Sequence, residues 1–486
     1  MYNTKKYLLG ALAGIATLVT SNALAADQFF AKQQAYWQDQ VYPAAAGAQS
    51  IGSAQAALQS TNTVRVGVID GAFAETPDLT YSEGYNFVTA DGRGTDFLSK
   101  DADLVSTCEK GHGTAVSSII AAKDDSWGIR GVFPSAELVV ARVTKCGTFA
   151  RQDLADAITW MAGGTVDDVT SISSPVNVIS VSLSTNQTCE NPIKSAVEYA
   201  ISQGITVVAS VGNADAEDTP LAPSDCPGVI GVGSVNHEGL KSVFSNLVSD
   251  SDISAMGEDV YAPTALDENN DGVLEFASWT GTSFSTPIVS GIVAMLLSEN
   301  NALKPYEIDS ILKASAGKII APTDYSGPTD TSGRDCGESN KCGFGVVNAL
   351  KAIEIARNYK NDTEFSIVNK LKDMNDCDVK FLMDSIGKTV DVCSVYSLNV
   401  NKNVDKTVQT VEVYEVPSTD ELLASNGTLA GKSNSGIVKL ANLKDSNTVK
   451  FGYRFCTSDI FGTYSCQSDA LTEVKNVDLT KPDACN

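Results

Sequence analysis

The sequence predicts an α/β fold: a doubly wound, mostly parallel sheet with helices on both faces, followed by a small antiparallel β-sandwich. Five short runs of β-branched and small residues have the character of buried parallel strands, at 65–69, 138–141, 178–181, 205–209 and 229–232. Helical patterns lie between them, near 113–122, 152–161 and 193–203. Strands and helices that alternate at this spacing are typical of βαβ units.

The N-terminal residues 1–25 have the three-part pattern of a cleaved secretion signal. Lys5 and Lys6 precede an apolar run at 8–19, and an Ala-Leu-Ala motif follows at 23–25. No other stretch of the sequence is long and apolar enough to span a membrane. We therefore expect a secreted, extracellular protein, which would cross the periplasm if the cell is Gram-negative.

The next segment, 26–62, is rich in Ala and Gln, and we expect it to form an N-terminal arm packed on the main domain. A chain of 486 residues is long enough for two domains, of which we place the larger at 63–358. Its 59 acidic against 35 basic residues give a formal charge of −24, which disfavours nucleic acid or an anionic membrane as partner. We expect a monomer.

Cysteine usage indicates disulfides rather than metal sites, because the chain is exported and contains no Cys-x-x-Cys pair. The count of eleven is odd, so one thiol is unpaired or bonded to another molecule. Three pairs are close enough in the chain to close local loops: Cys336/Cys342, Cys377/Cys393 and Cys456/Cys466.

The candidate active-site residues begin at the ends of predicted strands, where the chemistry of such sheets gathers. Asp70 follows the first strand and Asn213 follows the fourth. Ser283 stands at the start of the run 281–297, which is apolar on almost every face and predicts a buried helix. The free N–H groups of that first turn would sit where an acyl oxyanion develops. The alternative for Ser283 is a cap on an ordinary core helix.

An imidazole base must be one of two residues, because the chain contains only His112 and His237. His237 lies in a polar turn after a strand, and we interpret it as structural. His112 lies between two glycines at the start of a helix, and small neighbours let another chain approach the ring. A capped turn is the alternative there. Together, Asp70, His112, Asn213 and Ser283 fill every role that acyl transfer needs.

Three segments, 68–71, 111–114 and 281–283, resemble the signature segments of the subtilisin-like serine proteases, the subtilase or S8 family. The resemblance extends over about 64–356. Shorter matches support it: the substrate strand at 177–182, the oxyanion segment at 209–213, the strand at 262–263 and the end of the domain at 343–349.

The resemblance implies a subtilisin-like fold and a secreted serine endopeptidase that hydrolyses proteins or peptides through an acyl-enzyme. It implies no cofactor for the chemistry, although members of the family often bind structural calcium. The residue roles that it implies are catalytic for Asp70, His112 and Ser283, oxyanion-stabilising for Asn213, and substrate-binding for Ser182, Leu183 and Ser184.

Some positions depart from the family pattern. The segment 182–185 lacks the glycine pair usual at the wall of the specificity pocket, so no cleavage preference is carried over. The segment 27–62 is too short for the usual folding propeptide. The family resemblance also suggests a Cys189–Cys226 bridge across the pocket and a Cys108–Cys146 bridge beside His112.

An acidic run at 267–272 has two interpretations. Asp267, Asn269 and Asp271 have the alternating oxygen ligands of a calcium loop. However, the twelfth position is Ser278 instead of the Glu of an EF-hand, so an acidic surface turn is the alternative.

The C-terminal segment 359–486 predicts the β-sandwich, similar in pattern to fibronectin III or immunoglobulin-like modules. Short alternating runs occur at 390–392, 407–414 and 449–455, and the segment 456–466 predicts a hairpin. We find no chemistry there, so its role as a binding module or a spacer stays open.

Two other functions remain open from the sequence. A peptide ligase or cyclase uses the same acyl-enzyme but transfers it to an amine. A binding protein on an inactive protease scaffold is the alternative outside enzymes, although all four candidate positions are filled.

Overall fold

The computed structural model describes residues 27–37, 49–60, 62–99, 110–248, 251–264, 275–327, 329–336 and 341–359, and beyond residue 359 the backbone of short strands only. The predicted secretion signal at 1–25 lies outside these residues. Within the part of the chain that is described, no helix has the length and apolar character needed to cross a membrane.

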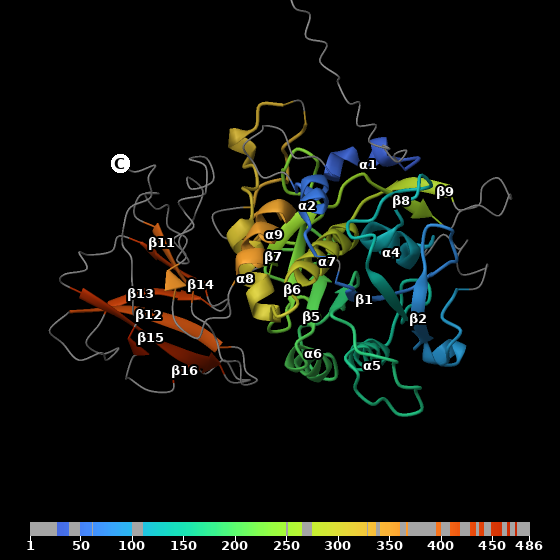
Figure 1. Cartoon of the computed structure of the whole chain (residues 1–486), viewed down its shortest axis with the longest axis horizontal. Helices are drawn as coiled ribbons and strands as arrows, with labels where there is room; N and C mark the ends of the chain where they lie inside the picture. Colours follow the sequence, from blue (N-terminus) through green and yellow to red (C-terminus); the bar gives the residue numbers. More distant parts are fainter. Residues whose placement is uncertain are drawn as a thin grey trace, which may run out of the picture.

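The core of the fold is a seven-stranded sheet in which every neighbouring pair of strands is parallel. The strand order is β2-β3-β1-β4-β5-β6-β7 (Figure 1). This confirms the predicted α/β fold. The strands are β1 Arg65–Asp70, β2 Tyr81–Asn86, β3 Glu137–Arg142, β4 Val178–Val181, β5 Thr206–Ser210, β6 Ile230–Val235 and β7 Ser251–Met256.

The strand order reverses at β1. From β1 the chain builds β3 and β2 on one side, and then β4 to β7 on the other side. In open α/β sheets, ligands bind outside the carboxyl ends of the strands at such a reversal. Asp70 is the last residue of β1, so the topology places it at this point.

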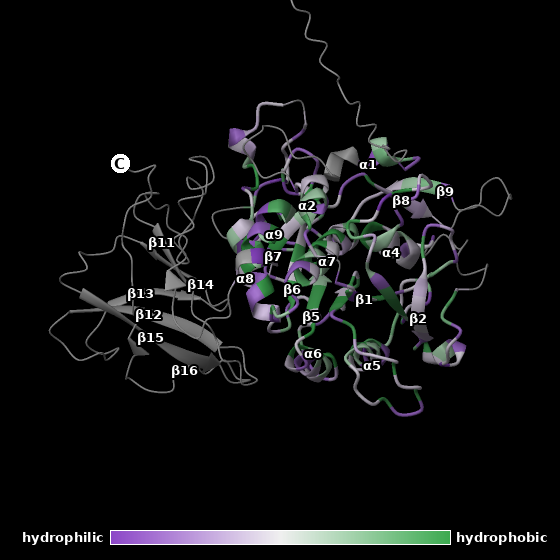
Figure 2. Cartoon of the chain, viewed as in Figure 1, coloured by the Kyte–Doolittle hydropathy of each residue, from purple (hydrophilic) through white to green (hydrophobic). Residues whose placement is uncertain are grey.

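Helices cover both faces of the sheet. One hydrophobic cluster packs α4 (His112–Ala121) and α7 (Thr282–Glu299) against one face, which includes Val68 of β1. The other cluster packs α5 (Arg151–Met161) and α6 (Ile193–Ser202) against the opposite face, which includes Ile69. Successive strand residues point to opposite faces, so one uninterrupted apolar run supplies both clusters. Figure 2 shows this apolar character in β5 and β6.

Helix α7 is buried along almost its whole length, as its apolar pattern predicted. Every residue from Thr282 to Ser298 is buried. Helices α8 (Pro305–Ser315) and α9 (Ala349–Asn358) complete this layer (Figure 1).

Two strands of the sheet, β2 and β7, were not predicted. Both are edge strands, and each contains polar residues where the central strands have β-branched ones. An edge strand pairs on one side only and need not be apolar throughout. A further antiparallel pair, β8 (Val260–Thr264) and β9 (Glu275–Trp279), precedes α7.

The described part of the N-terminal segment packs on the main domain. It contains α1 (Phe30–Trp37) and α2 (Ile51–Ala57). The Phe29 ring lies 4.7 Å from the Phe276 ring between centroids, and the Gln33 side chain donates to the Arg130 carbonyl at 2.8 Å. Ile51 of α2 is fully buried.

The strands beyond residue 359 pair antiparallel, as expected for this segment. One sheet has the order β10-β11-β14, and another has β13-β12-β15-β16 with β17 also on β15. The predicted strand at 390–392 lies outside the described residues. The strands are β10 Ser366–Ile367, β11 Val395–Asn399, β12 Gln409–Pro417, β13 Thr428–Ser433, β14 Ile437–Ala441, β15 Val449–Ser458, β16 Tyr464–Cys466 and β17 Thr472–Glu473.

The local cysteine pairs have different outcomes. A disulfide joins Cys336 and Cys342, which confirms that pair. Cys456 and Cys466 lie directly opposite each other in the register of β15 and β16. Cys377 and Cys393 lie outside the described residues.

Candidate active site

Asp70 and His112, 42 residues apart in the chain, are joined by a hydrogen bond. His112 Nδ1 lies 2.8 Å from Asp70 Oδ1. Asp70 is 1% exposed, so its carboxylate is shielded from solvent. The same oxygen accepts the Gly71 N–H at 2.7 Å. Two donors therefore fix the orientation of this carboxylate.

The glycine after His112 makes this contact sterically feasible. The Gly113 N–H donates to the Gly71 carbonyl at 2.8 Å, so the start of α4 lies directly against the end of β1. A Cβ at Gly113 would lie 2.3 Å from that carbonyl oxygen. Any side chain would push the helix, and His112 with it, away from Asp70.

Ser283 lies in the first turn of α7, as the sequence predicted. Its hydroxyl donates to the Ser182 carbonyl at 3.2 Å, and the Ser182 hydroxyl donates to the Ser283 carbonyl at 2.8 Å. The second bond depends on Pro287. Proline has no N–H to donate to the carbonyl four residues earlier, so the Ser283 carbonyl is available to Ser182. The helix start is thereby bonded to the end of β4.

Aromatic rings place the start of α7 beside His112. The Phe284 ring lies 5.3 Å from the His112 ring between centroids, and the Trp279 ring lies at 6.2 Å. These two residues flank Ser283 in the chain. The structure thus brings Asp70 and His112 into direct contact and Ser283 alongside them.

The Asn213 amide is oriented by Thr282. Asn213 Oδ1 accepts both the Thr282 N–H and the Thr282 hydroxyl, each at 2.8 Å. With its oxygen occupied, the amide has its Nδ2 group to offer as donor, beside Gly281. Thr282 was not among the predicted site residues, although its place directly before Ser283 is a signal for it.

The three predicted substrate-binding residues continue from β4 past the edge of the sheet. Ser182 is the one bonded to Ser283, as described above. Leu183 is partly buried against the cluster that contains α5 and α6. The Ser184 hydroxyl donates to the Ser210 carbonyl at the end of β5, at 3.3 Å.

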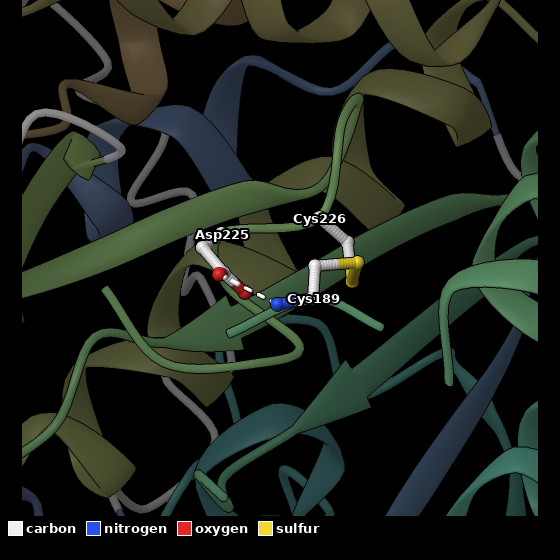
Figure 3. Close-up of side chains that lie close together, drawn as sticks. All are labelled: Cys189, Asp225 and Cys226. Carbon is white, nitrogen blue, oxygen red and sulfur yellow. Dashed lines mark hydrogen bonds between the residues drawn. A yellow bond between two sulfur atoms is a disulfide. The ribbon is translucent and has the colours of Figure 1, made fainter. Parts of the chain in front are cut away.

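The predicted bridge between Cys189 and Cys226 is confirmed. Figure 3 shows that the Asp225 carboxylate points to the Cys189 backbone, whose N–H it accepts at 2.8 Å. Burial raises the pKa of Asp225, against the effect of its hydrogen bond from the Cys189 N–H. The two sulfurs and the carboxylate are close enough to hold a metal, but both sulfurs are in the disulfide and are no longer thiolate ligands. Cys146 is also disulfide-bonded, while its predicted partner Cys108 lies outside the described residues.

The remaining histidine is exposed, as its sequence context predicted. The side chain of His237 is 57% exposed, with Nε2 3.6 Å from Glu238 Oε1.

The predicted calcium candidates Asp267, Asn269 and Asp271 lie outside the described residues. A different pair of buried carboxylates, Asp27 and Asp78, faces the loop 123–130. Asp27 accepts the N–H groups of Asp125 and Ser126, and Asp78 accepts that of Ile129.

These two carboxylates are 4% and 1% exposed, and each has a buried oxygen without a hydrogen-bond partner. Desolvation raises the pKa of Asp78 to about 7 and also raises that of Asp27. Unpaired carboxylate oxygens held out of water are suitable ligands for a hard cation such as calcium. This pair has no local signal in the sequence, because its two members are 51 residues apart.

The chain is similar to known proteases in sequence and in structure. The model of the subtilase family matches residues 61–345, more than half of the chain. The chain is 31% identical over 314 residues to an extracellular protease of Xanthomonas campestris pv. campestris, covering 60% of this chain and 51% of that protein. It is 27% identical over 246 residues to an extracellular basic protease of Dichelobacter nodosus, covering 50% and 38%. It therefore spans about half or less of the length of these two relatives.

A solved protease from Pseudoalteromonas arctica PAMC 21717 is similar in structure. Its TM-score is 0.58 at 27% identity, and the match covers 69% of this chain and 100% of that one.

Replacing both Cys189 and Cys226 by Ser should lower the free energy of unfolding by about 4 kcal/mol, because the bridge closes a loop of 37 residues. The matched control replaces Cys336 and Cys342, whose loop of 6 residues predicts only about 2 kcal/mol. Urea unfolding of both variants measures the difference. Equal losses would contradict the loop argument.

Proposed function

The chain belongs to the subtilase family, and from this premise we propose that it is a secreted serine endopeptidase that hydrolyses peptide bonds through an acyl-enzyme. The observation that carries the proposal is the Asp70–His112 hydrogen bond beside the buried helix start that bears Ser283. In that arrangement the imidazole can remove the proton of the hydroxyl, and the carboxylate can stabilise the imidazolium that forms.

The first step is attack of the Ser283 hydroxyl on the scissile carbonyl. His112 accepts the hydroxyl proton and later gives it to the leaving amine. Its Nδ1 is bonded to Asp70, so Nε2 is the nitrogen for this transfer. Asp70 holds that tautomer and stabilises the imidazolium that forms. In the second step His112 takes a proton from water, which attacks the acyl ester. His112 then returns the proton to the Ser283 oxygen as the acid product leaves.

Negative charge on the carbonyl oxygen develops at the start of α7. The Asn213 Nδ2 group and the Ser283 backbone N–H are the donors we assign to it. Thr282 occupies the Asn213 oxygen with two hydrogen bonds, so the amide is already oriented before substrate binds. The first turn of a long helix adds its positive dipole end. Hydrogen-bond donors that are already in position need not rearrange as the transition state forms.

The substrates are proteins or peptides, bound in extended form along residues 182–184. These residues follow β4 in the chain. Ser182 is bonded to Ser283 by two hydrogen bonds, one in each direction, so the segment begins beside the nucleophile. Secretion is supported by the disulfides, which persist in oxidising surroundings, and by relatives named extracellular proteases. We propose that the enzyme acts as a monomer.

We propose that a structural calcium ion binds at the Asp27 and Asp78 carboxylates. Their unpaired buried oxygens would bind the ion and tie the N-terminal segment to the loop after α4. The ion would supply positive charge that offsets the burial of two acids. It has no part in the chemical steps.

The proposed activity is tested by digesting a denatured protein mixture with the wild type and with Ser283→Ala, followed by mass spectrometry of the new termini. New termini from the wild type alone are the expected result. Ligated products in the presence of an added amine would indicate a ligase, and equal patterns from both proteins would overturn the proposal. A fluorophosphonate label on Ser283 should appear in the wild type only.

Asn213→Ala should fold normally and lower kcat by roughly 10²–10³, the effect known from subtilisin itself when its side-chain oxyanion donor is removed. The side chain of Asn213 is exposed, so its removal leaves no cavity. Steady-state kinetics on a chromogenic peptide measures the effect. An unchanged kcat would remove Asn213 from the site.

Calcium should raise the thermal midpoint of the wild type, and EDTA should lower it. At about a hundredfold excess over Kd, the stabilisation is about 3 kcal/mol. Asp78→Asn removes a charged ligand and should abolish the calcium effect. Asp156→Asn is the control, because Asp156 lies on α5 and pairs with Arg93, apart from this pair. A calcium effect that survives in Asp78→Asn would contradict this placement of the ion.

A further inference from the structure

The turn that carries Asn213 is held by a second asparagine, Asn246, from a different part of the chain. Asn246 is 1% exposed. Its Oδ1 accepts the N–H groups of Ala214 at 2.9 Å and Ala216 at 3.0 Å, and its Nδ2 donates to the Val211 carbonyl at 2.9 Å. One side chain therefore binds the backbone on both sides of Asn213.

The backbone of Asn246 contributes a fourth bond to the same turn. Its N–H donates to the Gly212 carbonyl at 3.2 Å. Gly212 has φ of +104°, and a Cβ there would lie 2.5 Å from Asn246 Nδ2. Glycine is thus required at 212 both for the backbone conformation and for the close approach of the Asn246 amide.

Residues near Asn246 in the chain make further bonds to the same turn. The Asp215 N–H donates to the Phe244 carbonyl at 2.8 Å, and the Leu247 N–H donates to the Ala216 carbonyl at 2.8 Å. Lys241, 1% exposed, places its ammonium 2.9 Å from Asp215 Oδ1. These contacts lie on the C-terminal side of Asn213. Among the residues named here, Asn246 is the one whose bonds reach both sides.

We propose that Asn246 is a positioning residue for the oxyanion donor Asn213, an inference that rests on the proposed protease function. Asn213 itself is exposed, and its amide is oriented by Thr282 at one end only. The position of its Cα is set by the turn, and the turn is set by Asn246. An oxyanion donor acts only if it is held near its working position, because a misplacement of about 1 Å can cost about 10²-fold in rate.

The chain offers a matched control in Asn236. This residue is 3% exposed, and its Oδ1 also accepts two backbone N–H groups, those of Glu238 and Leu240, each at 3.0 Å. Its Nδ2 donates to Glu238. The two asparagines hold turns by the same chemistry, but only the Asn246 turn carries Asn213. A purely structural role predicts similar effects from both substitutions.

The experiment compares Asn246→Ala and Asn236→Ala, each in the wild-type and in the Asn213→Ala background, on one chromogenic peptide. Asn246→Ala should lower kcat by about 10- to 100-fold with KM within about twofold. In the Asn213→Ala background the same change should cost about twofold or less, because the donor it positions is already absent. Asn236→Ala should leave kcat near that of its parent in both backgrounds.

Asn246→Asp serves if the alanine variant does not fold. It keeps an acceptor for the Ala214 and Ala216 N–H groups but sets a carboxylate oxygen against the Val211 carbonyl in place of the donor, so it should displace the turn and lower kcat in the background that retains Asn213. Thermal melts of every variant confirm folding. An equal kcat loss from Asn246→Ala in both backgrounds, an equal loss from Asn236→Ala, or no loss at all would overturn the proposal. A wild type no more active than Ser283→Ala would instead overturn the protease function, and this inference with it.

Discussion

The burial of helix α7 is the constraint on which the rest of the site depends. Close-packed side chains surround this helix on all sides, so they oppose both its translation and its rotation. Its first turn is therefore held in one place. Ser182, Asn213 and His112 approach that turn from the ends of β4 and β5 and from the start of α4.

Polar residues within α7 set its register on the sheet. The Ser290 hydroxyl donates to the Ser180 hydroxyl of β4 at 2.8 Å, and the Ser285 hydroxyl donates to the Ala255 carbonyl of β7 at 3.0 Å. Buried hydroxyls are costly without partners, so a register that loses these bonds is disfavoured. The same bonds align Ser283 with Ser182. Apolar packing holds the helix against the sheet, and the serines decide where along the sheet it lies.

Residues with a strong local signal were predictable. Asp70 ends an apolar strand, His112 stands between glycines, and Ser283 opens a long apolar run. The edge strands β2 and β7 gave no such signal, because their residues need not be apolar. Thr282, Asp78 and Asn246 were also missed. Each is an ordinary polar residue whose significance comes from a partner 30 or more residues away in the chain.

By itself, the sequence determined the alternation of strands and helices, the chemical groups available at the strand ends and the helix start, and the cysteines available for disulfides. These depend on local periodicity and residue type, which the chain carries before it folds. Only the tertiary structure decided that Thr282 orients the Asn213 amide, that Asn246 holds the turn around Asn213 and that Asp78 faces the loop 123–130. Such contacts follow from the order of strands in the sheet, and hydrophobic pattern alone does not specify that order.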